Sequence, residues 1–438
     1  MFSCDLSPAL DFSAPVLHMS LIRSVHHLQF ACKDVWHAYQ VFAGGFGYHF
    51  HCMSKHGNYV NLVLKNGTSM IMLSESGKAA VYDHPNSYLY EMTNRYMQRD
   101  RPFDIALEVR DVSQVCDRLR RFGGGADSVL LDPVTHSDYH GKIDMAVIRS
   151  CLPGVLHTVL DTSKYKGLFL PGYTVPELGA EPTLKRKLQE QKSTLHSHPA
   201  NVVCLDHIAL ACRTGESDQV IRWYDDVFGM RRAPANVSDD DVNGFVVKHN
   251  DTGMRLKAIV PTESVSKSTL ESINSCNFVL VEPLEYSSPN QVTRFLDANG
   301  GPGIQHIGLA VSDIFKAVSA CRTGGIRFID PPETYYDQLS QNPSFPYSHV
   351  SMDKLRKSGI LLDTEITAVS RLNPTGDVAF IMQIFTSALF ERDAFFMELI
   401  QRYAEASGFG AGNITALWLA VEAALNADRR RANRSPST

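Results

Sequence analysis

Two histidines and one glutamate in the second half of the chain are of the types that bind a metal ion. His207 lies inside the apolar stretch 205–210, and His306 lies at the same position of a similar stretch, 304–309. Glu398 interrupts a third apolar run, where a carboxylate is costly unless it is paired or bound to a cation. Two imidazoles and one carboxylate on neighbouring strands form the facial triad of non-haem Fe(II) oxygenases. These residues therefore predict a ferrous site with positions left for substrate and O2.

Each of these side chains also has an ordinary structural interpretation. A single histidine on a strand is more often a hydrogen-bonded core residue than a ligand. Glu398 has Arg402 nearby as an ion-pair partner. The joint case is stronger, because both histidines occupy the same position of a repeated motif. Spacing alone leaves the metal-binding and structural interpretations both open.

The elements that would position these side chains form an internal repeat. Four segments share a strand-like alternation of apolar residues. Helix-compatible stretches that end before glycine follow three of them. This pattern predicts an α+β fold with two similar halves, each built from two modules. The strand segments are 25–30, 103–109, 205–210 and 304–309, and the helical stretches are 111–122, 216–228 and 312–322.

A proline- and glycine-containing stretch with a run of charges separates the two halves. It reads as a linker with room for a short helix. We expect the following order: an N-terminal extension (1–21), an N-terminal half (22–175), the linker (176–200), a C-terminal half with a closing helix (201–427) and a disordered basic tail (428–438).

Composition excludes several classes of protein. The formal net charge is -5, so nothing attracts the chain as a whole to nucleic acid. The nine cysteines include no Cys-x-x-Cys pair, which argues against a disulfide framework and favours reduced thiols. The sequence has no run of 18 consecutive apolar residues, so we expect no integral membrane segment. The N-terminal region is not rich in arginine, so its composition leaves the compartment open.

Several motifs resemble those of the 4-hydroxyphenylpyruvate dioxygenase family. The resemblance covers about residues 22–427 and is strongest after residue 300. It implies tandem βαβββ modules of the vicinal oxygen chelate fold (glyoxalase/bleomycin resistance/dihydroxybiphenyl dioxygenase), with a non-catalytic N-terminal half and the iron in the C-terminal half. The matching motifs occur in the family's order, at residues 301–309, 382–386, 395–402 and 408–413, with another at 169–173 in the linker region.

The resemblance also implies the ligands and the substrate pocket. The implied metal ligands are again His207, His306 and Glu398, for one Fe(II) per chain. O2 is the co-substrate, and no 2-oxoglutarate is needed because the substrate, a small aromatic 2-oxo acid, carries its own. Strand alternation would place Gln305 on the face opposite His306. The implied substrate-binding residues are Gln291, Gln305, Gln383, Phe385, Phe396 and Phe409.

Departures from the family pattern bear on the product. Members that make homogentisate carry Asn-Glu-Pro where this chain has residues 281–283, and Leu256 and Ile414 replace a pocket serine and phenylalanine. Residues 331–336 and 413–418 resemble an animal branch that is thought to make 4-hydroxymandelate in mitochondria for the ubiquinone head group. We expect that reaction and location. The alternatives are homogentisate formation in tyrosine catabolism, a non-catalytic metal- or ligand-binding paralogue, and a cytoplasmic location.

The N-terminal half offers a weaker metal-site hypothesis. His27, Asp104 and His157 lie where ligands would fall in the pseudo-repeat. The favoured interpretation is that the N-terminal half is non-catalytic and packs against the C-terminal half. The sequence leaves formation of a homo-oligomer open.

Overall fold

The computed structural model describes most of the chain between residues 19 and 418. The described residues are 19–56, 59–76, 99–122, 126–176, 186, 188–189, 200–235, 238–249, 251–262, 276–285, 290–364, 378–391, 394–404, 406–410, 412–416 and 418. Most of the predicted linker, most of the closing helix and the whole basic tail lie outside the described residues.

The described N-terminal half is built on one eight-stranded sheet with the order β2-β3-β4-β1-β5-β8-β7-β6. The predicted strands at 25–30 and 103–109 lie within β1 and β5, and the predicted helix at 111–122 is α3. The elements are β1 (Ile22–Ala31), α1 (Val35–Gln40), the π-helical turn η1 (Val41–Gly45), β2 (His49–His56), β3 (Tyr59–Asn66), β4 (Ser69–Ser76), β5 (Arg101–Val109), α3 (Val112–Phe122), the 3-10 turn η2 (Ala126–Ser128), β6 (Val129–Asp138), β7 (Gly141–Arg149) and β8 (Leu156–Asp161).

The described C-terminal half is built on a second sheet, with the order β10-β12-β13-β9-β14-β17-β16-β15 and β11 paired to β12. Its strands are β9 (Val202–Ala211), β10 (Met230–Ala233), β11 (Phe245–His249), β12 (Thr252–Pro261), β13 (Phe278–Pro283), β14 (Gly303–Val311), β15 (Leu361–Asp363), β16 (Phe380–Phe385) and β17 (Phe396–Tyr403). Its helices are α5 (Ser217–Phe228), α7 (Gln291–Asn299), α8 (Ile314–Thr323), α9 (Glu333–Ser340) and α10 (Met352–Ser358).

Each half consists of two βαβββ modules, so the predicted fold class is confirmed. The first strands of the two modules pair antiparallel at the centre of each sheet, β1 with β5 and β9 with β14. The last strand of every module returns to pair parallel with its first strand, as β13 does with β9 and β17 with β14. The four strands β13, β9, β14 and β17 are therefore neighbours in the middle of the C-terminal sheet.

A one-residue β-bulge recurs at an equivalent place in the first strand of every module. The extra residue is His26 in β1, Phe103 in β5, Asp206 in β9 and Gln305 in β14. A bulge interrupts the strict alternation of side chains between the two faces of a strand. The residues that directly follow the four bulges are, in the same order, His27, Asp104, His207 and His306.

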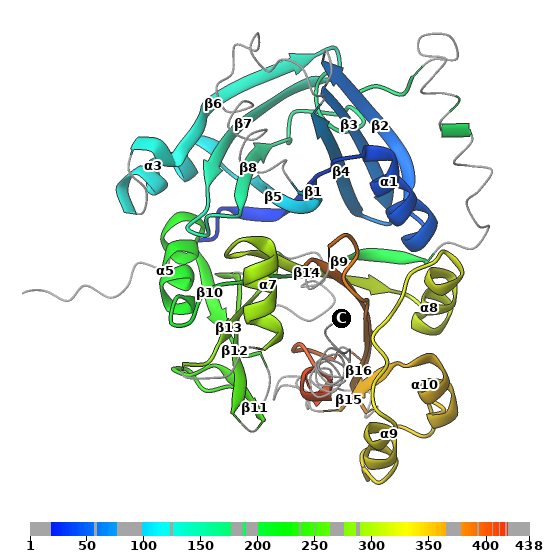
Figure 1. Ribbon diagram of the computed structural model, residues 1–438. Coiled ribbons are helices and arrows are strands. Elements are labelled where there is room, and N and C mark those ends of the chain that lie inside the picture. The colour runs from blue at the N-terminus through cyan, green and yellow to red at the C-terminus, as the bar shows by residue number, and fades with distance from the viewer. Residues whose placement is uncertain are drawn as a thin grey trace, which may run out of the picture.

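Figure 1 shows the two sheets stacked, with helix α3 of the N-terminal half lying beside helix α5 of the C-terminal half. One apolar core runs through both halves. Phe30 of the N-terminal half, for example, packs edge-on against Phe395 of the C-terminal half, with ring centroids 5.3 Å apart. Burial of such apolar surface is the main force that holds the halves together. Among the described residues, no helix has the length and apolar character that a membrane crossing requires.

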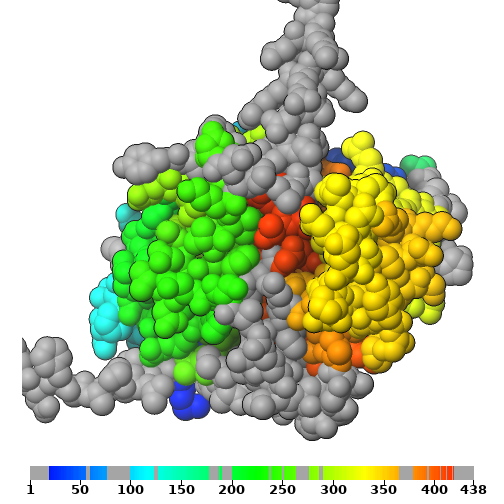
Figure 2. All heavy atoms as spheres, turned by 90° about the horizontal axis from the view of Figure 1, so that it is seen from below, coloured from blue at the N-terminus to red at the C-terminus, as the bar shows by residue number. Residues whose placement is uncertain are grey.

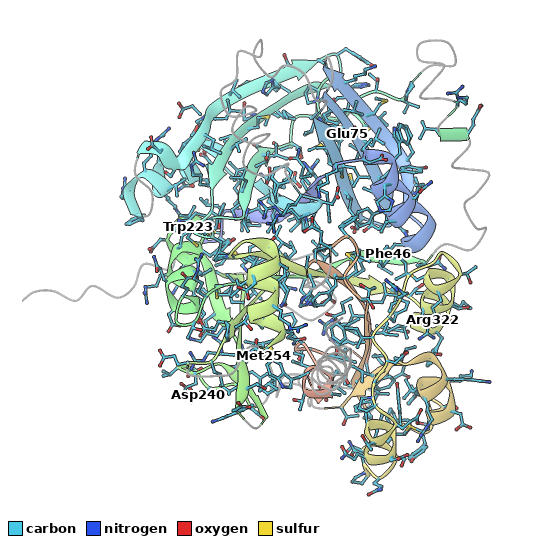
Figure 3. The ribbon with its side chains drawn as sticks, viewed as in Figure 1. Phe46, Glu75, Trp223, Asp240, Met254 and Arg322 are labelled. Atoms are coloured by element: carbon cyan, nitrogen blue, oxygen red, sulfur yellow. The ribbon has the colours of Figure 1, made fainter. Side chains whose placement is uncertain are left out.

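His157, on β8, is part of the contact between the halves. Its side chain is fully buried; Nδ1 donates to the carbonyl of Ile105 at 3.0 Å, and Nε2 accepts from the hydroxyl of Tyr224 at 2.9 Å. Trp223, labelled in Figure 3 on helix α5, stacks beside it with ring centroids 6.1 Å apart. Burial lowers the pKa of His157 from 6.5 to about 4. The imidazole is therefore neutral in the folded protein at neutral pH.

We predict that His157 makes the protein less stable in mild acid. Below pH 6.5 the unfolded chain takes up a proton at His157 that the folded chain does not, down to about pH 4. This difference lowers the free energy of unfolding by about 2 kcal/mol at pH 5 relative to pH 7. Urea unfolding of the wild type and of His157→Gln at both pH values measures it.

The pH dependence of the free energy of unfolding must be compared between the wild type and His157→Gln, because other groups also titrate in this range. His26 acts in the same direction, whereas Asp104, whose pKa burial raises to about 6, acts in the opposite direction. Both groups remain in the variant, so only the contribution of His157 should disappear from the slope. An unchanged difference between pH 7 and pH 5 in His157→Gln would contradict the prediction.

Candidate metal centre

His207, His306 and Glu398 come together on one face of the C-terminal sheet. The Nε2 atoms of the two histidines are 3.4 Å apart, and the Oε2 atom of Glu398 lies 3.3 Å from the first and 3.6 Å from the second. Donor atoms that each lie about 2.0–2.2 Å from one shared ion have separations of this size. They form the one group of three potential metal ligands found among the described residues. The residues present therefore fit a metal ion.

The two bulges fix which nitrogen of each histidine faces the centre. Asp206 Oδ1 lies 2.9 Å from His207 Nδ1, and Gln305 Oε1 lies 3.2 Å from His306 Nδ1. Each acceptor oxygen keeps the proton on Nδ1, which leaves the Nε2 lone pair free for a metal. Strict alternation predicted Gln305 on the face opposite His306. The bulge corrects this, because it turns Gln305 toward the same face.

A glycine provides the space for the first imidazole. Gly308 on β14 is the register partner of His207 on β9 and of Glu398 on β17. A Cβ atom at Gly308 would collide with the imidazole ring of His207. The ring can therefore lie across β14 toward the other ligands only because this position lacks a side chain.

Glu398 is held from behind by Gln383 on β16. The Nε2 group of Gln383 donates to Glu398 Oε1 at 2.8 Å and to the carbonyl of Phe409 at 3.2 Å. Asn413 Nδ2 donates to Gln383 Oε1 at 2.7 Å. Gly410 passes so close to this oxygen that a Cβ atom there would collide with it. The polar atoms of Gln383 are thus occupied by the protein, while Glu398 Oε2 faces the histidines.

The electrostatics of the three candidate ligands favour a cation. Burial lowers the pKa of His207, but Glu398 and Asp206 outweigh it and raise the value to about 9. Burial and the neighbouring His207 hold the pKa of His306 well below its ordinary value. The site thus attracts one positive charge but does not hold two protonated imidazoles. A divalent cation would satisfy all three donors at once.

A small, partly open cavity lies beside the three candidate ligands. Met254, on β12 in Figure 3, belongs to its wall. In the view of Figure 2, the red C-terminal segment lies between the green surface of the β10–β13 region and the yellow surface around α8 and α9. Besides the three ligands, the lining consists of Gln291, Gln305, Phe385, Phe396, Phe409, Met254, Leu256, Val279, Val281 and Ile414.

The structure thus places five of the six expected substrate-binding residues at the cavity and Gln383 behind Glu398. Gln291 is the first residue of α7, whose N-terminus is fixed by a capping box at Asn290. Phe396 stacks on His306 with ring centroids 4.7 Å apart, and Phe409 meets His207 edge-on at 5.3 Å.

Two further lining residues, Met254 and Val279, were not identified from the sequence. Each lies two positions before a residue that was, Leu256 on β12 and Val281 on β13, so strand alternation could have found them. Leu256 and Val281 are register partners on these neighbouring strands. The wall of β12 and β13 is therefore aliphatic.

The second metal site considered for the N-terminal half is not formed among the described residues. Asp104 accepts hydrogen bonds from the backbone and the hydroxyl of Thr158. His157 binds Ile105 and Tyr224 instead, as described above. His27 contacts the imidazole of His26 through their Nδ1 atoms, 2.8 Å apart. This half therefore has a structural role at these positions.

Known proteins resemble this chain over most of its length. Residues 205–341 match the model of the Glyoxalase/Bleomycin resistance protein/Dioxygenase superfamily. A 4-hydroxymandelate synthase mutant from Streptomyces coelicolor shares the fold, with a TM-score of 0.68 and 21% identity, and the match covers 93% of this chain and 100% of that one.

Relatives known by sequence extend the comparison. The 4-hydroxyphenylpyruvate dioxygenase of Dictyostelium discoideum is 29% identical over 321 residues, 73% of this chain and 76% of that protein. The 4-hydroxyphenylpyruvate dioxygenase-like protein of Rattus norvegicus is 30% identical over 383 residues, 86% of this chain and 90% of the rat protein. The human protein of the same name is 30% identical over 369 residues, 82% of this chain and 86% of its own length. The chain therefore belongs to the family of 4-hydroxyphenylpyruvate dioxygenase-like proteins.

Proposed function

We propose that this chain is an Fe(II)-dependent dioxygenase that converts 4-hydroxyphenylpyruvate and O2 into 4-hydroxymandelate and CO2. The observation that carries the proposal is the convergence of His207, His306 and Glu398 beside a cavity with aromatic and aliphatic walls. Two neutral imidazole nitrogens and one carboxylate suit a ferrous ion and leave positions for a chelating 2-oxo acid and for O2. Because the substrate supplies its own 2-oxo acid, 2-oxoglutarate is not required.

The protein contributes orientation and exclusion of water. Bound Fe(II) would supply the activation of O2 and the redox chemistry. Phe385, Phe396 and Phe409 offer flat apolar surfaces against which an aromatic ring packs. Gln291 offers an amide to the polar parts of the substrate, since among the described residues the acceptor found for its Nε2 group is the weak one Met254 Sδ, at 3.6 Å. Glu398 acts as a ligand rather than as a base.

The aliphatic wall supports 4-hydroxymandelate rather than homogentisate as the product. Leu256, Val281 and Ile414 offer no hydrogen bond to a ring hydroxyl. The ring is then held by packing, and a displacement of about 1 Å is enough to change which carbon is attacked. Hydroxylation at the benzylic carbon gives 4-hydroxymandelate, whereas hydroxylation of the ring followed by side-chain migration gives homogentisate.

We extend the proposal to the biological setting that the resemblance to the animal branch implies. The product would supply the ubiquinone head group, and the enzyme would act in the mitochondrion. Imaging of the full chain with a C-terminal tag tests the location. A purely cytoplasmic distribution would contradict it.

We predict that the wild type binds one Fe(II) per chain and that Glu398→Ala weakens this binding more than about 100-fold. Loss of an outer partner typically costs 10–100-fold, and a direct ligand should cost more. Anaerobic titration measures the affinity, and oxygen consumption with 4-hydroxyphenylpyruvate measures turnover. Glu391→Ala is the matched control, because this carboxylate pairs with Lys33 away from the site. Unchanged turnover in Glu398→Ala would contradict the proposed function.

We also predict that 4-hydroxymandelate is the main product. The two candidate products are isomers of equal mass, so they must be separated by chromatography against both standards. In Val281→Asn, a polar group enters the aliphatic wall, and the share of homogentisate should rise. Val281→Ala changes the volume of the wall without adding polarity and should not raise it. Homogentisate as the main wild-type product would overturn the proposed reaction but not the metal site.

A further inference from the structure

Asp206 sits directly behind the candidate ligand His207. Its side chain is 3% exposed, and one of its oxygens faces Nδ1 of His207. This contact sets the tilt of the imidazole and leaves Nε2 pointing at Glu398 Oε2, 3.3 Å away. A buried carboxylate in this place is itself costly without a compensating positive charge.

Arg402 provides that charge. Its Nε and one terminal nitrogen donate to the two oxygens of Asp206, both at 2.8 Å. Such a two-pronged contact fixes direction as well as distance, because the guanidinium is planar. Arg402 lies on β17, four residues after Glu398. Strand β17 therefore carries both the candidate ligand Glu398 and Arg402, which holds Asp206 against the candidate ligand His207.

The remaining terminal nitrogen of Arg402 reaches a different part of the molecule. Nη1 donates to the carbonyl of Ala406 at 3.2 Å and to that of Gly408 at 2.8 Å. The next residue, Phe409, lines the cavity and touches the ring of His207. A single guanidinium thus holds both the partner of a metal ligand and the segment that carries an aromatic wall of the cavity.

We propose that Arg402 is a positioning residue that couples metal binding at His207 to ordering of residues 406–410 over the cavity. The inference rests on the metal site of the proposed function. If Arg402 holds both sides, a metal that fixes His207 and Asp206 also fixes the guanidinium and, through it, the carbonyls of Ala406 and Gly408. The coupling is reciprocal, so loosening the segment weakens metal binding.

Lysine cannot replace arginine in this arrangement. An ammonium group keeps the charge but cannot make the planar two-pronged contact with Asp206 while also reaching two carbonyls. Arg402→Lys is therefore the informative variant. Arg356→Lys is its matched control, because Arg356 also contacts two carboxylates, Glu333 and Asp337, but on the exposed surface of the same half.

The test uses Co(II) alone as the probe, with two readouts. Optical titration gives the affinity, and hydrogen–deuterium exchange of peptides spanning residues 406–410 gives the ordering. The amide of Phe409 is informative because it donates to the carbonyl of Ala235 at 3.1 Å. In the wild type and in Arg356→Lys, Co(II) should slow this exchange. In Arg402→Lys, the affinity should fall about 10- to 100-fold, and Co(II) should no longer slow exchange.

A second variant covers the case in which Arg402→Lys does not fold. The double substitution Asp206→Asn with Arg402→Gln removes both buried charges together, so no uncompensated charge remains. Asn can still accept from His207 Nδ1, but Gln reaches fewer partners, so the coupling should again be lost. If the folded variant keeps both the wild-type affinity for Co(II) and the wild-type slowing of exchange, the proposed role of Arg402 is overturned, while the metal site stands. A wild type that binds no Co(II) overturns the metal site and this inference with it.

Discussion

The pairing of β14 with β9 on one side and β17 on the other is the interaction on which the candidate site depends. It places Gly308 between His207 and Glu398, while His306 lies two residues earlier on the same strand. The candidate ligands converge because the middle position has no side chain to keep them apart. A backbone register, rather than any flexible loop, therefore sets the spacing of the donor atoms.

The N-terminal half has the same strand pairing, but other residue types stand at the positions of Gly308 and Glu398. There Ala106 is the partner of His27, where the C-terminal half has Gly308 opposite His207. The pairing of Asp104 with Leu156 makes Thr158 the counterpart of Glu398. Thr158 donates to Asp104, so two positions that could have faced an ion satisfy each other. The fold supplies the geometry, and the residue types at a few positions decide whether it holds a cation.

Short-range periodicity predicted the modules and singled out His207, His306 and Glu398 as candidate ligands, although spacing alone left their structural interpretation open. Alternation along a strand put Phe396 and Glu398 on one face, and the repeat made His207 and His306 equivalent. It failed at Gln305, because a bulge of one residue reverses the face and leaves no clear signal in the sequence. The role of Gln383 was missed for another reason. Its amide is directed by partners 15 and 30 residues away, at Glu398 and Asn413.

The two halves also differ in what covers the concave face of each sheet. In the N-terminal half Phe169 packs into an apolar cluster and lies 4.8 Å from the ring of His27. In the C-terminal half Phe409 takes the comparable place beside His207 and also packs into an apolar cluster, but its segment is joined to the sheet in addition through hydrogen bonds from Arg402 and Gln383. Water can replace hydrogen bonds at small net cost, whereas exposing a packed aromatic ring is costly. The hydrogen bonds at the Phe409 segment are the part of this contact that water can replace, and Phe409 also lines the cavity, so this segment suits a site that a substrate must enter.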